Sequence, residues 1–140
     1  MIRKRGKYTM QTTNYKGYVV TLSDMDTNKL EKAGWRGAAR HWRCIVYDKT
    51  KRKQMGFDTF GGSATTMSPL EALYMICEDA CTFMQIDDVD DVMNEYGYSD
   101  YTAAKNVFKG LQKAYYQCRR FIGSDDDICE IANDLREEWG

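Results

Sequence analysis

The stretch that decides the fold is residues 54–84, QMGFDTFGGSATTMSPLEALYMICEDACTFM, where the spacing of apolar residues changes. Up to Phe60, apolar and polar residues alternate, which predicts a strand with one buried face. From Ser68 onward, apolar residues recur every three or four positions, which predicts a helix. Ser68 is a capping residue, Pro69 takes the first helical position and Glu71 the third. The chain therefore changes from strands to helices within this stretch.

Upstream, a second alternating segment predicts a partner strand. Residues 38–47, AARHWRCIVY, place Trp42 and Cys44 on one face, as expected for a half-buried strand. The polar residues 48–53 separate this segment from the next strand, so we expect a hairpin tip there. Residues 15–22, YKGYVVTL, are β-branched and aromatic and predict one further strand.

Downstream, the helical period continues to the end of the chain. A short acidic helix is expected over residues 87–95, ending at Gly97, and a long helix from about residue 100 to 122 with Ser99 as its cap. Ser124 caps a last helix that begins with three acidic residues. We therefore expect an α+β fold, with a small antiparallel sheet of about three strands in the N-terminal half. This sheet should pack against a C-terminal layer of three to four helices.

The size and composition of the chain fit one domain. Its 140 residues are 43% hydrophobic and 13% aromatic, with a single Pro. That composition excludes collagen, low-complexity disorder and a disulfide scaffold. Residues 1–14 are basic and show no apolar period. We therefore predict a basic flexible arm over residues 1–14 and a single α+β domain over residues 15–140.

Nothing in the sequence predicts a membrane span or a signal for export. No apolar run approaches the roughly 20 residues that cross a bilayer, and residues 1–17 contain no hydrophobic signal segment. The five cysteines are an odd number and are not clustered, which favours reduced thiols in the core. We therefore expect a cytoplasmic protein.

The net charge of −1 hides a strong separation of charge along the chain. Residues 1–53 contain 14 Lys and Arg and 4 Asp and Glu, whereas residues 54–140 contain 6 and 17. Ten acidic residues and no basic residue lie between Lys53 and Lys105. This asymmetry indicates a polyanionic partner for the first part, and a basic partner or nucleic-acid mimicry for the second. The alternative is that the two parts pack together and their fields partly cancel.

Two charged sets are therefore candidates for partner binding. The members of the acidic set are Asp87, Asp88, Asp90, Asp91, Glu95 and Asp100. The cations of the basic set, which also contains aromatic residues, are Arg36, Arg40, Arg43, Lys49, Lys51, Arg52 and Lys53. Such cations can neutralise phosphates while exposed aromatic rings stack on bases. The alternative is that Trp42 belongs to the core and the cations only keep a hairpin tip in solvent.

The histidine and the cysteines show no arrangement typical of a catalytic or metal site. His41 is the single histidine, and Cys44 lies on the opposite face of the same predicted strand, so the two do not pair locally. A tertiary partner for His41 stays open. Cys77 and Cys81 share a helix face and could supply two zinc ligands. The other two ligands are missing and both cysteines lie on an apolar stripe, which favours core packing.

The acidic runs do not have the residue order of a calcium-binding loop, and the glycine pair does not have that of a phosphate-binding loop. Residues 87–91 and 125–127 do not have the alternating ligands, central Gly and terminal Glu of a calcium loop. Residues 61–63, Gly-Gly-Ser, are not surrounded by a phosphate-loop pattern. We therefore predict that the protein is not an enzyme and that it holds neither a metal nor a cofactor.

Three short motifs occur together in a way that is typical of one protein family. An acidic patch ends in the turn Glu95-Tyr96-Gly97-Tyr98, Ser99-Asp100 caps a long helix, and Ala104-Lys105 follows near its start. With these residues, the segment 39–123 resembles small accessory proteins of bacteriophages and prophages of Firmicute-type hosts. The resemblance covers about 85 of the 140 residues. The last helix, with its Asp-rich start, does not match.

The resemblance implies a small phage protein without enzymatic activity. Such proteins often inhibit host defence, including CRISPR effector nucleases, by covering a surface that reads nucleic acid. Carboxylates spaced along helices can occupy the Arg and Lys clusters of such a surface. Our first hypothesis is therefore an inhibitor that acts in the host cytoplasm and binds a defence protein, for example a CRISPR effector, through the acidic set. The second is a nucleic-acid-binding accessory module that uses the basic arm and hairpin.

Overall fold

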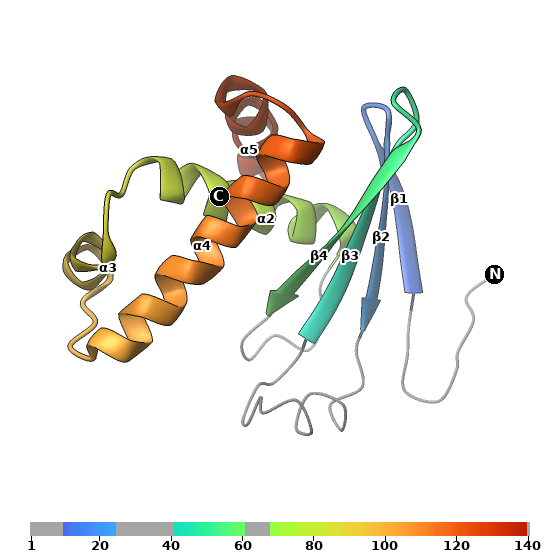
Figure 1. The fold of residues 1–140 in the computed structure, drawn as a ribbon. Helices are drawn as coiled ribbons and strands as arrows, with labels where there is room; N and C mark the ends of the chain where they lie inside the picture. Colours follow the sequence, from blue (N-terminus) through green and yellow to red (C-terminus); the bar gives the residue numbers. More distant parts are fainter. Residues whose placement is uncertain (1–9, 25–40, 61–67, 140) are drawn as a thin grey trace. The chain divides into compact units, whose positions relative to one another are not determined.

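The computed structural model describes residues 10–24, 41–60 and 68–139, and within them four strands precede four helices (Figure 1). The strands are β1 (Met10–Tyr15), β2 (Tyr18–Asp24), β3 (His41–Asp48) and β4 (Lys53–Phe60). The helices are α2 (Pro69–Met84), α3 (Val89–Tyr96), α4 (Tyr101–Phe121) and α5 (Asp125–Trp139). The α+β class is confirmed, with four strands where about three were expected.

The chain divides into two compact units, Met1–Leu73 and Tyr74–Gly140. Among the described residues, the first unit contains the strands and the second contains most of α2 together with α3, α4 and α5. The single domain expected over residues 15–140 stays a prediction.

The strands form one antiparallel sheet in the order β1-β2-β3-β4. Val20 pairs with Val46 across β2 and β3, and Cys44 pairs with Phe57 across β3 and β4. These four residues point to the same side of the sheet, because paired residues of neighbouring strands share a face and side chains alternate along each strand. All four are buried. The alternating apolar patterns therefore predicted the buried face of β3 and β4 correctly.

The strand expected over residues 15–22 is confirmed for residues 18–22 but is wrong before them, because the chain reverses at residues 16 and 17. Lys16 and Gly17 have positive φ angles of 41° and 87°, and the two flanking tyrosines pair with each other. Two successive left-handed residues form the turn that suits the twist of a β-hairpin, and glycine favours this conformation. The segment thus contains the end of β1, a turn and the first part of β2.

The flexible arm expected over residues 1–14 is wrong for residues 10–14. Residues 10–14 belong to β1, where they pair with residues of β2 from Ser23 back to Val19. These paired backbone groups make the segment part of the sheet. Residues 1–9 lie outside the described residues, so the arm itself stays a prediction.

The helix starts confirm two of the three predicted caps. Ser68 Oγ accepts a backbone N–H of the first turn of α2 at 3.2 Å. At the start of α5, Ser124 Oγ accepts the N–H of Asp127 at 3.2 Å, and Asp127 Oδ2 accepts the N–H of Ser124 at 3.1 Å. The cap of α4 is Asp100 and not the predicted Ser99. The helix begins one residue later because the Asp100 carboxylate takes the capping hydrogen bond.

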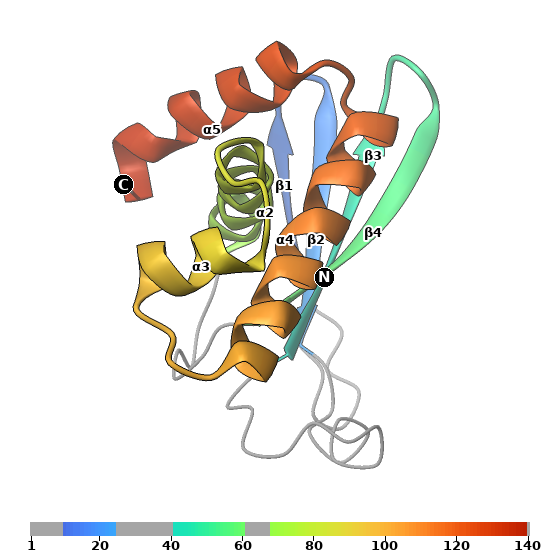
Figure 2. The same cartoon turned by 60° about the vertical axis from the view of Figure 1, so that its left-hand side comes forward.

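In the second unit, α3 lies beside the first turns of α4 (Figure 2). The two helices share an apolar cluster in which Ile86, Val92, Ala104 and Leu111 are buried. The half-buried side chains packed against this cluster are Phe83, Val89, Met93, Val107 and Phe108. The inner faces of α3 and α4 are thus apolar, and their polar residues lie on the outer faces.

Candidate functional site

Two members of the acidic set form the N-terminal cap of α3. Asp88 is the N-cap, and its Oδ1 accepts the N–H of Asp91 at 3.1 Å. Asp91 Oδ2 in return accepts the N–H of Asp87 at 2.7 Å and that of Asp88 at 3.4 Å. This reciprocal arrangement satisfies backbone donors that would otherwise lack partners. The carboxylates of Asp88 and Asp91 therefore have a structural role, whatever else they contact.

A third member, Asp100, has a similar role in α4. It is the N-cap of the helix, and its Oδ1 accepts the N–H of Thr102 at 3.0 Å. Half of the acidic set is thus engaged in helix caps. The sequence reasoning treated these six carboxylates as one surface and did not separate capping residues from the others.

Asp87, Asp90 and Glu95 are the other half of the acidic set. All three are exposed, and their side chains form no hydrogen bond or ion pair with the described residues. Asp90 lies on the side of α3 away from the buried Val92 because residues two positions apart point about 160° apart around a helix. Glu95 is in the last turn of the helix and is also exposed. Their charges are available to a partner.

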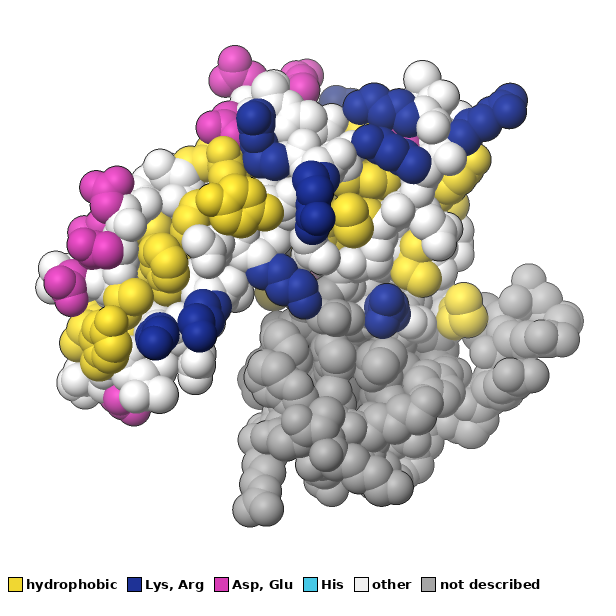
Figure 3. Space-filling model, viewed as in Figure 1, with side chains coloured by type: hydrophobic (Ala, Val, Ile, Leu, Met, Phe, Trp, Pro, Cys, Tyr) yellow, Lys and Arg dark blue, Asp and Glu magenta, His cyan; other side chains and the backbone are white. Residues whose placement is uncertain are grey.

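Three exposed tyrosines lie directly after these carboxylates. Tyr96 is 51% exposed, Tyr98 is 38% exposed and Tyr101 is 55% exposed. Gly97 ends α3 with a φ of 70°, a left-handed conformation that suits glycine, and the chain then enters α4. We call the following set the α3–α4 corner: Asp87, Asp90, Glu95, Tyr96, Tyr98 and Tyr101. Figure 3 shows acidic side chains gathered over α3, with hydrophobic side chains next to them.

The tyrosines were quoted in the sequence motif but were not identified as candidate site residues. Only Tyr98 gave a signal, because it lies between the two predicted helices. Tyr96 and Tyr101 lie three positions from Met93 and Ala104 and fit the apolar period of their helices. Their exposure is therefore known from the structure alone.

In the sheet, the basic hairpin tip is built around one buried acid. The side chain of Asp48 is buried, and its Oδ1 accepts the N–H groups of Thr50 at 2.9 Å and of Lys51 at 3.1 Å. The carbonyl oxygen of Asp48 also accepts the N–H of Arg52 at 2.8 Å. These bonds fix the turn between β3 and β4, which confirms the hairpin predicted over residues 48–53.

The neighbouring turn adds a lysine that the sequence reasoning missed. The N–H of Lys49 donates to the carbonyl of Gly17 at 3.0 Å, so the β1–β2 turn lies beside the β3–β4 turn. Lys16, one residue before Gly17, therefore lies at the same end of the sheet, and its ammonium is 5.5 Å from the ring centroid of Tyr15. We call the following set the hairpin tip: Lys16, Lys49, Lys51, Arg52 and Lys53.

Of the remaining basic candidates, the structure describes only Arg43, which is not at the hairpin tip. Arg43 is exposed on β3, five residues before Asp48, which is about 17 Å along a strand. Its guanidinium lies over Gly56 of the neighbouring strand, where a Cβ would come within 3.1 Å of it. Arg36 and Arg40 lie outside the described residues.

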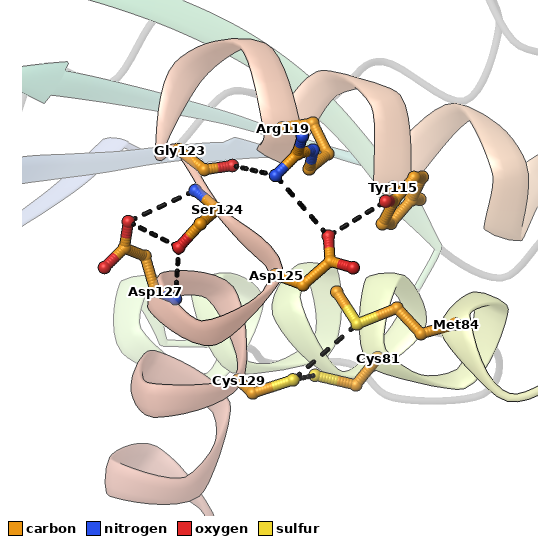
Figure 4. Close-up of polar contacts among 9 residues, drawn as sticks. All are labelled: Cys81, Met84, Tyr115, Arg119, Gly123, Ser124, Asp125, Asp127 and Cys129. Atoms are coloured by element: carbon orange, nitrogen blue, oxygen red, sulfur yellow. Dashed lines mark hydrogen bonds and ion pairs between the residues drawn. The ribbon is translucent and has the colours of Figure 1, made fainter.

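All five cysteines are free thiols, and four of them are buried as predicted, whereas Cys129 is half-buried and lies close to Cys81. Cys77 and Cys81 are both buried. The Sγ of Cys81 lies 3.3 Å from the Sγ of Cys129, which in turn lies 3.7 Å from the Sδ of Met84 (Figure 4). Burial, together with the hydrogen bond to Cys129, raises the pKa of the Cys81 thiol to about 12, so it is protonated and weakly nucleophilic at neutral pH. These sulfur atoms therefore form a packing contact between α2 and α5.

A polar network fixes the junction between α4 and α5 (Figure 4). Tyr115 donates its hydroxyl to Asp125 Oδ1 at 2.8 Å, and Arg119 lies 3.6 Å from the same oxygen. Arg119 also donates to the carbonyl of Gly123 at 3.4 Å. Asp125 therefore has a structural role at this junction.

Within the described ranges, no three His, Cys, Asp or Glu side chains are grouped to hold a metal ion.

The described helices do not include one that is long and apolar enough to span a bilayer. Comparison of the chain with protein-family models, with curated proteins and with solved structures finds no significant match.

Proposed function

We propose that the protein is a phage-encoded inhibitor without enzymatic activity that binds a host defence protein in the cytoplasm. The α3–α4 corner is its contact surface, and the partner surface is one that normally reads nucleic acid, such as that of a CRISPR effector. The observation that supports this best is the combination, within residues 87–101, of three exposed tyrosines with three exposed carboxylates that have no partner among the described residues.

The chemistry of this corner suits a basic protein surface. Carboxylates form charge-assisted, often bidentate hydrogen bonds with arginine, which is the residue that reads phosphate and guanine in such surfaces. Tyrosine is enriched among the residues that dominate binding energy, because its ring buries apolar area while its hydroxyl keeps a polar contact. The capping carboxylates Asp88, Asp91 and Asp100 contribute to this binding mainly by holding α3 and α4 in shape.

The experiment compares two variants that lose the same charge at different places. Asp87→Asn, Asp90→Asn and Glu95→Gln together neutralise the corner without removing a cap. Glu130→Gln, Glu137→Gln and Glu138→Gln together neutralise three exposed carboxylates of α5. Plating of a targeted phage on a CRISPR-immune host that expresses each protein measures inhibition.

We expect the corner variant to lose inhibition and the α5 variant to keep it. Loss of inhibition in both variants would indicate that overall negative charge matters and not the corner. Full inhibition by the corner variant would exclude the proposed acidic mechanism.

The second candidate is a nucleic-acid-binding accessory module that uses the hairpin tip. It is favoured by the convergence of two turns, which places Lys16 beside the cations of the β3–β4 turn. Binding at this tip should weaken steeply as salt rises, because each neutralised phosphate releases counterions. A gel shift at low and moderate salt with Lys49→Gln, Lys51→Gln and Lys53→Gln tests it. Binding that is unchanged in this variant would exclude the hairpin tip.

A further inference from the structure

Helix α4 has a charge distribution that neither proposed function uses. Its 21 residues include five cations and no Asp or Glu. Lys105, Lys109 and Lys113 are exposed and form no hydrogen bond or ion pair with the described residues. We call these three residues the α4 lysine stripe. The negative total of residues 54–140 concealed it in the sequence.

The spacing of the stripe places the three ammonium groups on one side of the helix. Residues four apart in an α-helix advance by about 6 Å along the axis and turn by about 40°, so the three lysines span an arc of about 80°. The buried residues Ala104 and Leu111 lie on the opposite side, against α3. Figure 3 shows Lys and Arg side chains following α4. The stripe is therefore a continuous cationic surface.

Two exposed tyrosines border the stripe. Tyr101 and Tyr116 are 55% and 52% exposed, and both lie within about 40° of Lys105 around the helix axis. The Tyr116 ring is held in place by aromatic contacts, with its centroid 5.3 Å from that of Tyr115 and 6.2 Å from that of Phe83. An exposed ring that is already fixed by its neighbours can stack on a base with little loss of side-chain freedom.

We propose that the α4 lysine stripe binds a single-stranded nucleic acid, with the lysines on successive phosphates and Tyr101 and Tyr116 against bases. Charge complementarity supports this occupant, since cations in a row beside aromatic rings are the combination that holds single strands. A membrane surface fits less well. Helices that lie on a bilayer insert large apolar side chains, whereas Val107, Phe108 and Leu111 of α4 belong to the apolar cluster shared with α3. This proposal does not depend on the inhibitor proposal.

The test measures binding of fluorescein-labelled oligonucleotides of about 15 nucleotides, oligo-dT and oligo-U, by fluorescence anisotropy. The stripe variant carries Lys105→Gln, Lys109→Gln and Lys113→Gln, which preserve helix propensity. The matched control carries Lys49→Gln, Lys51→Gln and Lys53→Gln, the same change of charge in the hairpin tip. Circular dichroism verifies that both variants keep their helices.

We expect the stripe variant to bind roughly 10- to 50-fold more weakly near 0.15 M salt. The slope of log K against log salt should become less steep by about 2, because three phosphate contacts on a single strand release about 0.7 counterions each. Tyr116→Leu keeps an apolar side chain against Phe83 and should weaken binding roughly 5-fold or more through loss of stacking. The control variant should retain the wild-type slope.

Three results would overturn the proposal. The first is that wild-type protein binds neither oligonucleotide at about 50 mM salt. The second is that the hairpin control loses as much affinity as the stripe variant, or more, which would assign binding to the hairpin tip or to overall charge. The third is that the protein binds vesicles containing phosphatidylserine and not the oligonucleotides, which would assign the stripe to a lipid surface.

Discussion

Helices α3 and α4 share one apolar cluster on their inner faces, yet their outer faces differ in both the sign and the use of their charges. Around α3, half of the acidic set is committed to caps through Asp88, Asp91 and Asp100. Along α4, the three lysines of the stripe have no described partner. The number of charges in a segment therefore does not equal the number that a partner can reach.

This difference affects how the two proposals are supported. The α3–α4 corner contains three carboxylates without a described partner and three exposed tyrosines. The stripe contains three lysines without a described partner and lies beside two exposed tyrosines. Tyr101 belongs to both sets. The two surfaces are neighbours, so variants that change one of them must leave the shared core and the caps intact.

The largest expected effect comes from breaking the core that the two helices share. Leu111 is buried in the cluster between α3 and α4. Leu111→Ala should reduce the free energy of unfolding by about 2–5 kcal/mol, because it removes buried methylene groups and leaves a cavity. Urea unfolding monitored by circular dichroism measures this loss. A decrease of less than about 1 kcal/mol would show that the two helices do not depend on a common core.

The second prediction separates capping carboxylates from free ones. Asp88→Ala removes the N-cap of α3 and should reduce the free energy of unfolding by about 1 kcal/mol. Asp90→Ala, two residues later, removes an exposed carboxylate without a described partner and should change it by less than about 0.5 kcal/mol. Parallel urea titrations compare the two. Equal losses would contradict the division of the acidic set into caps and free groups.

The third prediction concerns α4 alone. Gly110 lies in the middle of the helix, and a Cβ added there would meet nothing within 4 Å. Gly110→Ala should therefore increase the free energy of unfolding by about 0.5–1 kcal/mol, because alanine restricts the unfolded chain and favours the helix. Thermal unfolding measures the gain. If oligonucleotide binding also improves, the rigidity of α4 contributes to the function of the stripe.

The sequence predicted the local features that depend on nearby residues. The alternating pattern of residues 38–47 and 54–60 gave the hairpin, and Ser68 and Ser124 gave two helix starts, because period and capping are properties of a few successive positions. The turn at Lys16 and Gly17 was missed because the flanking residues on both sides are typical of strands. A Gly within a β-branched run should have indicated a turn.

The candidate site was harder to predict because it depends on what each charge contacts. The sequence could not show that Asp100 accepts the N–H of Thr102, that Lys16 lies beside Lys49, or that Cys129 approaches Cys81 across 48 positions. The α4 stripe, in contrast, was visible in principle. Lys105, Lys109 and Lys113 recur every four residues, but a net charge summed over the whole C-terminal part concealed them.

The smallest expected effect sharpens the comparison at the far end of α4, where Tyr115 and Arg119 have polar partners, unlike the lysines of the stripe. The hydrogen bond from Tyr115 to the Asp125 carboxylate raises the pKa of the Tyr115 phenol above its ordinary value of 10.0. Only the neutral phenol can donate this bond. Its stabilising effect is therefore complete below pH 10 and is lost as the pH rises through the raised pKa. Because the network is exposed to solvent, the effect on unfolding should be small.

Tyr115→Phe removes the donor and keeps the ring. Wild-type protein should be slightly more stable than the variant at neutral pH, and the difference should disappear well above pH 10, where the phenol is ionised in both the folded and the unfolded chain. Denaturant midpoints at the two pH values test this, and ultraviolet titration of tyrosinate should show that the variant has lost one late-titrating tyrosine of the wild type. An equal stability difference at both pH values would assign the effect to packing. In that case the hydrogen bond of Tyr115 would not distinguish the far end of α4 from the lysine stripe.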